Sequence, residues 1–166
     1  MTARAQSSHT HLIEVHLRPE FADTEGAGAL ALLQSQGLSS IKEARACRLY
    51  EIKGPLSANQ VLQTAKDLLC DAVTQEHRVV SASAGHLNGM NFWRVEVWLK
   101  PTVCDCVGET VSAAIAEMGL PQPEAVRCAT VYRLAGRSTK AQIEKAVSKS
   151  LANPLIHRFL VSEAHP

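Results

Sequence analysis

The segment IEVHLRP at residues 13–19 recurs 82 positions later as VEVWLKP at residues 95–101. The same offset, continued without a gap, pairs Asp23 with Asp105. Further identical pairs follow at this offset: Gly26 and Gly108, Gly37 and Gly119, Arg45 and Arg127, Tyr50 and Tyr132, and Gly54 and Gly136. Glycines, prolines and apolar positions coincide along an ungapped match, which indicates that the chain is one unit written twice.

Each copy predicts the element order β-α-β-α-β. The expected strands are residues 12–17, 43–52 and 76–82 in the first copy and 92–99, 125–134 and 155–161 in the second; the expected helices are 26–36, 58–71, 108–118 and 140–151. Asp23 and Asp105 stand where a side chain can cap the N-terminus of a helix. A helix cap explains their spacing to Gly26 and Gly108, so we favour this role over that of an acid. The pattern favours an α+β fold in which two β-α-β-α-β repeats pack as a pseudo-twofold dimer, with helices on one face of each sheet.

The small, polar segment 83–91 divides the chain into a first repeat at 1–82 and a second at 92–166. Residues 1–11 are expected to be disordered. A unit of about 80 residues buries too little surface to be stable on its own. The linker gives its partner unit a high effective concentration, so we expect the two repeats to pack together.

Composition excludes several functional classes. Hydrophobic residues make up 46% of the 166, which excludes wholesale disorder, and no apolar run reaches the length of a membrane span. Seventeen Lys and Arg against sixteen Asp and Glu give no general electrostatic reason to bind nucleic acid or a membrane surface. The polar N-terminus and the odd number of five cysteines predict reduced thiols and a cytoplasmic location.

No motif for a nucleotide loop, a serine nucleophile or a zinc protease is present. Cys104-Asp105-Cys106 could bind a soft metal or react as a thiol, but two free thiols in a turn are the favoured interpretation. Cys70 and Cys128 are expected to be small core residues, Cys70 on the apolar side of a helix. We therefore expect no catalytic, cofactor-binding or metal-binding residue, and a thiol or metal enzyme remains a third alternative.

Three segments of the second copy form a recognisable pattern: residues 95–101, the turn Val103-x-Asp105-x-x-Gly108, and the tail Leu151-Ala152-Asn153-Pro154-Leu155-Ile156. In these segments the second copy resembles PurS, the accessory subunit of phosphoribosylformylglycinamidine (FGAM) synthase in purine biosynthesis. The first copy resembles the family less well, because residues 70–74 replace most of this tail. Both copies also lack the proline that usually follows the turn aspartate.

This resemblance implies a non-catalytic scaffold that joins the PurL-like synthetase part of this ligase to its PurQ-like glutaminase part, as a free subunit or as the front of a longer chain. ATP and Mg²⁺ would serve the partner synthetase, and further association between copies is conceivable. The candidate partner-interface residues are Lys100, Pro101, Asp105, Asn153, Pro154 and Ile156. The candidate contacts between the repeats are Arg45, Arg127, Tyr50 and Tyr132, with solvated sheet-face charges as an equal alternative for the two arginines.

A tandem small-molecule-sensing regulatory domain is the alternative function. Tandem β-α-β-α-β units also resemble amino-acid-sensing domains, whose ligands bind near a glycine-containing turn between strand and helix. Gly26 and Gly108 are placed suitably for such a site, whereas the Leu-Ala-Asn-Pro-Leu-Ile tail favours PurS.

Overall fold

The computed structural model describes residues 8–80 and 92–164 of the chain, and both halves contain the predicted order of elements. The first half contains β1 (His9–Leu17), α1 (Thr24–Ser35), β2 (Ile41–Gly54), α2 (Ala58–Thr64), the π-helical turn η1 (Ala65–Leu69) and β3 (Gln75–Val80). The second half contains β4 (Phe92–Leu99), α3 (Cys106–Glu117), β5 (Ala125–Gly136), α4 (Lys140–Ser150) and β6 (His157–Ala164).

Local capping explains where the helices begin and end. The Asp23 carboxylate accepts a hydrogen bond from Gly26 N at the start of α1, and Asp105 does the same for Gly108 N at the start of α3, so both predicted caps are confirmed. The chain leaves these two helices at Gly37 and Gly119, whose φ angles of 94° and 76° lie in the left-handed region that glycine adopts without strain.

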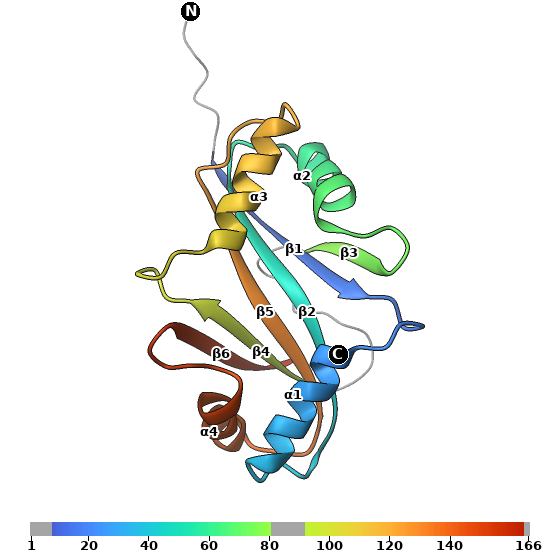
Figure 1. Ribbon diagram of the computed structural model, residues 1–166, viewed down its shortest axis with the longest axis vertical. Helices are drawn as coiled ribbons and strands as arrows, with labels where there is room; N and C mark the ends of the chain where they lie inside the picture. Colours follow the sequence, from blue (N-terminus) through green and yellow to red (C-terminus); the bar gives the residue numbers. More distant parts are fainter. Residues whose placement is uncertain (1–7, 81–91, 165–166) are drawn as a thin grey trace, which may run out of the picture.

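All six strands form a single antiparallel sheet in the order β3-β1-β2-β5-β4-β6 (Figure 1). The α+β class is confirmed, but the expectation that each repeat has its own sheet was wrong. The long strands β2 and β5 pair from Ile41 with Gly136 to Lys53 with Ala125, and this ladder joins the two halves. Because β2 also pairs with β1 and β5 also pairs with β4, neither of the two strands is an edge.

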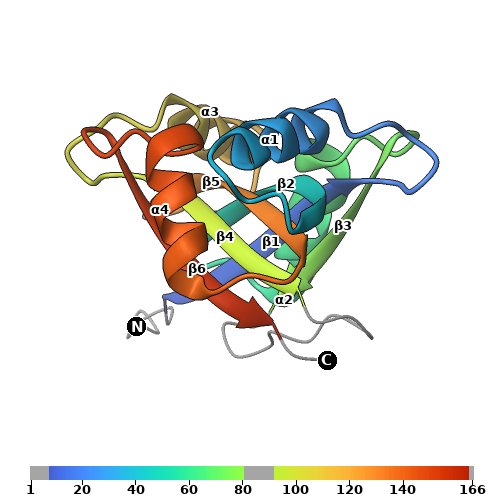
Figure 2. The ribbon, with the colours of Figure 1, turned by 90° about the horizontal axis from the view of Figure 1, so that it is seen from below.

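The helices α1 and α3 lie over the same face of β2 and β5, with α2 and α4 near opposite ends of these strands (Figure 2). One core cluster packs Leu33 of α1 against Val95 of β4 and Ile143 of α4. A second cluster packs Ile115 of α3 against Ile13 of β1 and Val61 of α2. Each of the helices α1 and α3 therefore contributes to the core over the other half of the chain, and neither half encloses a core made from its own residues alone.

The structure modifies three local expectations. Strand β1 begins at His9, so residues 9–11 belong to the sheet rather than to a disordered end. The helix expected over 58–71 is α2 followed by the wider turn η1, and Cys70 lies just beyond it in extended backbone.

The expected linker 83–91 lies outside the described residues. Within the described part of the chain, no helix combines the length and the apolar character needed to cross a membrane.

Candidate functional site

The loop that follows β4 and the turn that precedes β6 are held against each other at one end of the sheet. Lys100 N donates a hydrogen bond to Ile156 O over 2.8 Å, and the Lys100 ammonium group contacts Pro154 O. The structure thus brings together three of the six candidate interface residues, although they come from segments more than fifty positions apart in the chain.

Asn153 shapes the turn before β6, which we call the Asn153 turn (residues 153–156). Its side-chain oxygen accepts from Leu155 N at 3.0 Å, and its backbone oxygen accepts from His157 N at 2.8 Å. A side chain that bonds to the backbone two residues ahead stabilises a turn by itself. The result is that Leu155 projects outward with 82% of its surface exposed, beside Ile156 at 39%.

Asp105 has a positioning role. One carboxylate oxygen accepts from Gly108 N at 2.8 Å and the other accepts from Cys128 N at 2.7 Å, so the residue ties the start of α3 to the neighbouring strand β5. Asp23 makes the equivalent bonds to Gly26 N and to Ala46 N, both at 2.7 Å. Both carboxylate oxygens of Asp105 therefore have hydrogen-bond partners inside this chain. Pro101, another candidate interface residue, is exposed on the surface.

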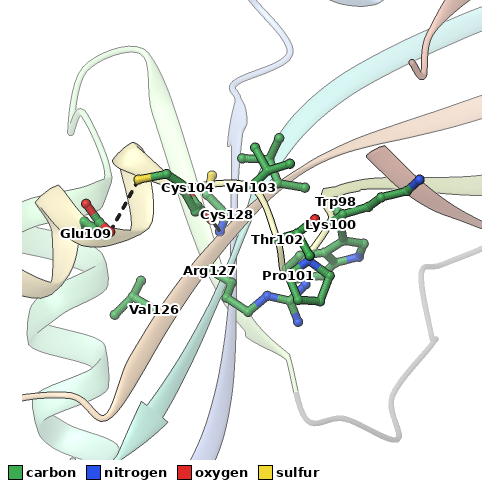
Figure 3. A pocket seen from close by; sticks show the side chains of 12 residues that line it. Trp98, Lys100, Pro101, Thr102, Val103, Cys104, Glu109, Val126, Arg127 and Cys128 are labelled. Carbon is green, nitrogen blue, oxygen red and sulfur yellow. Dashed lines mark hydrogen bonds between the residues drawn. The ribbon is translucent and has the colours of Figure 1, made fainter. Parts of the chain in front are cut away.

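A groove of about 480 Å³ lies between the loop after β4 and strand β5 (Figure 3). Its walls include Trp98, Pro101, Thr102, Arg127 and Cys128. The Arg127 guanidinium lies 5.0 Å from the centre of the Trp98 ring. It also pairs with the Glu51 carboxylate at 3.5 Å. Cation–π and ion-pair contacts therefore engage the Arg127 guanidinium.

The cysteines beside this groove are not activated. Cys104 Sγ lies 3.7 Å from Cys106 Sγ and 3.4 Å from Glu109 Oε1, and these hydrogen bonds raise the pKa of Cys104 to about 11 (Figure 3). Burial raises the pKa of Cys128 to about 11 as well. Both thiols are protonated at neutral pH, and a thiol is a poor nucleophile in that form. Among the described residues, no three His, Cys, Asp or Glu side chains gather as a metal-binding group.

The four candidate contacts between the repeats all lie on the paired strands β2 and β5. Arg127 crosses the junction to Glu51. Tyr50 and Tyr132 are half-buried in the two core clusters, and burial raises the pKa of each phenol. Arg45 lies opposite Arg133, and it makes no hydrogen bond or ion pair with any residue in the described ranges.

Sequence reasoning missed a buried cluster of charged residues around Glu14. Glu14 is completely buried on β1, where its carboxylate pairs with Arg78 at 3.1 Å, with Arg133 at 2.6 Å, and with Arg94. Burial alone would raise the pKa of Glu14, but the positive charges of Arg94, Arg133 and Arg78 together lower it. A signal in the sequence was the glutamate repeated at positions 14 and 96, which in both copies stands between two β-branched apolar residues.

Part of the second half of the chain is similar to a known family. Residues 93–163 match the family model described as PurS: phosphoribosylformylglycinamidine (FGAM) synthase. No curated protein sequence matches the chain. The match begins within β4 and ends within β6, so the segment that contains the Asn153 turn and the groove is PurS-like and is consistent with a role in FGAM synthase.

Proposed function

We propose that this chain is a non-catalytic assembly component of FGAM synthase that joins a PurL-like synthetase part to a PurQ-like glutaminase part. The PurS match over residues 93–163 supports a place in this enzyme of purine biosynthesis. In this role the chain needs no reacting group of its own. ATP, Mg²⁺ and glutamine would be bound by the partners.

We further propose that the first half is a diverged second PurS-like unit, and that the two units form a pseudo-twofold pair. The register of the β2–β5 ladder supports this arrangement. Arg48 and Thr130 are cross-strand partners near the middle of the ladder, and they are also 82 positions apart, which is the offset of the sequence repeat. An axis between these two residues would relate each strand of one half to its counterpart in the other.

The observation that carries the docking role is the exposure of Leu155. A leucine that is 82% exposed at the tip of a hydrogen-bonded turn leaves apolar surface in water until something covers it. Ile156 lies beside it, and the nearby ammonium group of Lys100 adds a charge at the rim of the same surface. Interfaces are commonly built from an apolar centre with a polar rim, which is the composition found here.

The first half provides a matched control. Val73 stands at the position that corresponds to Leu155 and is 73% exposed. Its turn is fixed in a similar way, because the Asp71 carboxylate accepts hydrogen bonds from Val73 N and Thr74 N. Leu155→Ser and Val73→Ser both remove an exposed apolar group without opening the core. If the second half docks the partner and the first half mainly pairs with it, only Leu155→Ser should weaken assembly.

The test measures glutamine-dependent FGAM synthesis by purified synthetase and glutaminase from the same source, with and without this chain. The proposal expects activity and a co-eluting complex to require the chain, and Leu155→Ser to weaken assembly by about tenfold or more, as for a central interface residue. Equal effects of Leu155→Ser and Val73→Ser would contradict the docking surface. Full activity without the chain would contradict the scaffold itself.

Packing at the turns argues against the alternative of a sensing domain that binds its ligand beside Gly26 and Gly108. A Cβ atom added at Gly108 would lie 2.3 Å from Val126 O, and one added at Gly26 would lie 2.5 Å from Ala44 O. Backbone atoms fill the space that such a ligand would need. A thermal-shift screen with amino acids and nucleotides tests this alternative, because a bound ligand raises the unfolding temperature.

A further inference from the structure

A second cavity, of about 240 Å³, lies where the end of β1 meets β2 and β5. Its lining includes His16, Arg45, Cys47, Glu76 and Arg133, and we call it the arginine pocket. His16 is the cross-strand partner of Cys47, and Arg45 is the partner of Arg133. Since side chains alternate between the faces of a strand, Arg45 and Cys47 project from the same face of β2.

Several polar groups of the arginine pocket have no acceptor or donor in the described part of the chain. Arg133 uses Nη2 to bind Glu14, but its Nε is buried without a hydrogen-bond partner. His16 uses Nε2 to contact Glu76 at 2.8 Å, and its Nδ1 is buried without a partner. The guanidinium of Arg45 has neither a hydrogen bond nor an ion pair with a described residue. Unpaired polar groups in a partly buried site are unfavourable unless water or a ligand satisfies them.

The carboxylates near the arginine pocket are already engaged. Asp23 accepts from two backbone N–H groups, Glu76 holds His16, and Glu14 is shared by arginines that include Arg133. The group left without a counter-charge is Arg45. It lies directly opposite Arg133, and like charges in that position repel each other unless an anion lies between them.

Two neighbouring arrangements show how such a repulsion is removed elsewhere in the fold. Arg94 and Arg133 are also direct cross-strand partners, and the Glu14 carboxylate bridges them. In the groove of the second half, Arg127 lies against Trp98 and Glu51. At the corresponding positions around Arg45, 82 residues away, the chain has His16 in place of Trp98 and Arg133 in place of Glu51. These exchanges leave Arg45 free and place a second cation beside it.

We propose that the arginine pocket binds the phosphate or carboxylate group of a small molecule between Arg45 and Arg133. Guanidinium groups match the geometry of both oxyanions, and the hydrogen bonds formed are charge-assisted. The cavity volume of about 240 Å³ is below the range of pockets that enclose a whole drug-sized ligand. The site therefore fits an oxyanion with a small substituent, or the charged end of a larger molecule. The proposal of an anion site in the arginine pocket does not depend on the proposed role in FGAM synthase.

The test titrates the full chain with inorganic phosphate, glycerol 3-phosphate or glutarate at constant ionic strength, and follows the Nε–H resonances of Arg45 and Arg133 by NMR. The proposal expects saturable shifts with at least one of these anions. Phosphate compounds alone or glutarate alone would identify the class of the natural ligand. Binding of both the phosphate compounds and glutarate would mean that the site recognises negative charge and does not distinguish the geometry of the two oxyanions.

Arg45→Gln removes the free cation without disturbing the Glu14 cluster, and Lys42→Gln is the matched control because Lys42 is an exposed cation on the same strand. We expect Arg45→Gln to weaken binding on the order of tenfold or more, since it removes a charge-assisted contact. Lys42→Gln should bind as the parent does. The proposal is overturned if no anion gives saturable shifts, or if Arg45→Gln and Lys42→Gln bind equally well.

Discussion

Arg133 of β5 donates a hydrogen bond from Nη2 to Glu14 Oε2 of β1 over 2.6 Å, and 119 residues separate the two along the chain. The two strands are not neighbours in the sheet, because β2 lies between them. Glu14 also binds Arg94 of β4, three strands away from its own. A single buried carboxylate thus links the first half of the chain to two strands of the second.

Glu14→Gln should strongly destabilise the chain. The substitution removes the buried negative charge that three arginines share. Arg94 keeps its pair with Glu96, but Arg133 loses its ion-pair partner, and breaking a buried ion pair typically costs about 3–5 kcal/mol. Glu51→Gln is the control, because its pair with Arg127 is longer and partly exposed and should contribute less than about 1 kcal/mol. Urea unfolding at neutral pH measures both. Similar losses for the two variants would show that the Glu14 cluster has no special role.

The same cluster predicts loss of stability in acid. The three arginines hold the pKa of folded Glu14 below its ordinary value of 4.5, so the unfolded chain takes up the proton first as the pH falls. The stabilisation is complete above about pH 4.5 and disappears as the pH falls through the lowered pKa of the folded state. Urea unfolding between pH 7 and pH 3 should show a steeper decline for the parent chain than for Glu14→Gln. Parallel declines would rule out Glu14 as the source.

Gly108→Ala should destabilise the fold, whereas Gly28→Ala should stabilise it. A Cβ at Gly108 would meet Val126 O at 2.3 Å, and crowding of this kind costs roughly 1–3 kcal/mol. A Cβ at Gly28 in α1 meets nothing within 4 Å, and alanine inside a helix is favoured over glycine by about 0.5–1 kcal/mol. Thermal unfolding of the two variants gives the comparison, and changes of the same sign would contradict it.

Alkylation of Cys104 should be slow despite its exposure. Hydrogen bonds with Cys106 and Glu109 raise its pKa to about 11, so only a small fraction of this thiol is ionised at pH 8. Glu109→Gln removes the carboxylate charge and leaves a weaker amide acceptor, and we expect Cys104 to react with iodoacetamide several-fold faster. Peptide mass spectrometry measures the extent of alkylation at each cysteine separately. Cys47 is the internal control, since burial raises its pKa to about 11 and Glu109→Gln leaves its surroundings intact. An unchanged rate at Cys104 would contradict the assigned cause.

The elements that the sequence predicts well are those fixed by local chemistry. The bounds of β4 agree with the expected strand 92–99, and α1 and α3 begin beside aspartates that cap them as expected. The Asn153 turn is also fixed by local bonds, which join residues two to four positions apart, but the strand expected over 155–161 was placed too early, because β6 begins at His157. In these segments the physical cause and its effect lie within one turn of backbone.

Features that depend on distant segments could not be predicted from the sequence. The repeat suggested two units with separate sheets, because alternation within a strand does not reveal which strand will pair with it. The exchange of α1 and α3 across the two cores has no local signature. Glu14 alternates with Ile13 and Val15, a pattern typical of a solvated charge, and its arginines lie 64 or more positions away in the chain.

Among the described strands, β3 pairs only with β1 and β6 pairs only with β4, so these two strands form the edges of the sheet. An unpaired edge is a template on which a strand of another molecule can add, and charged side chains oppose that addition. On β6, Arg158 and Glu163 flank Leu160, whose side chain is 61% exposed. Charges on the outermost strand β6 therefore oppose edge-to-edge aggregation of this protein.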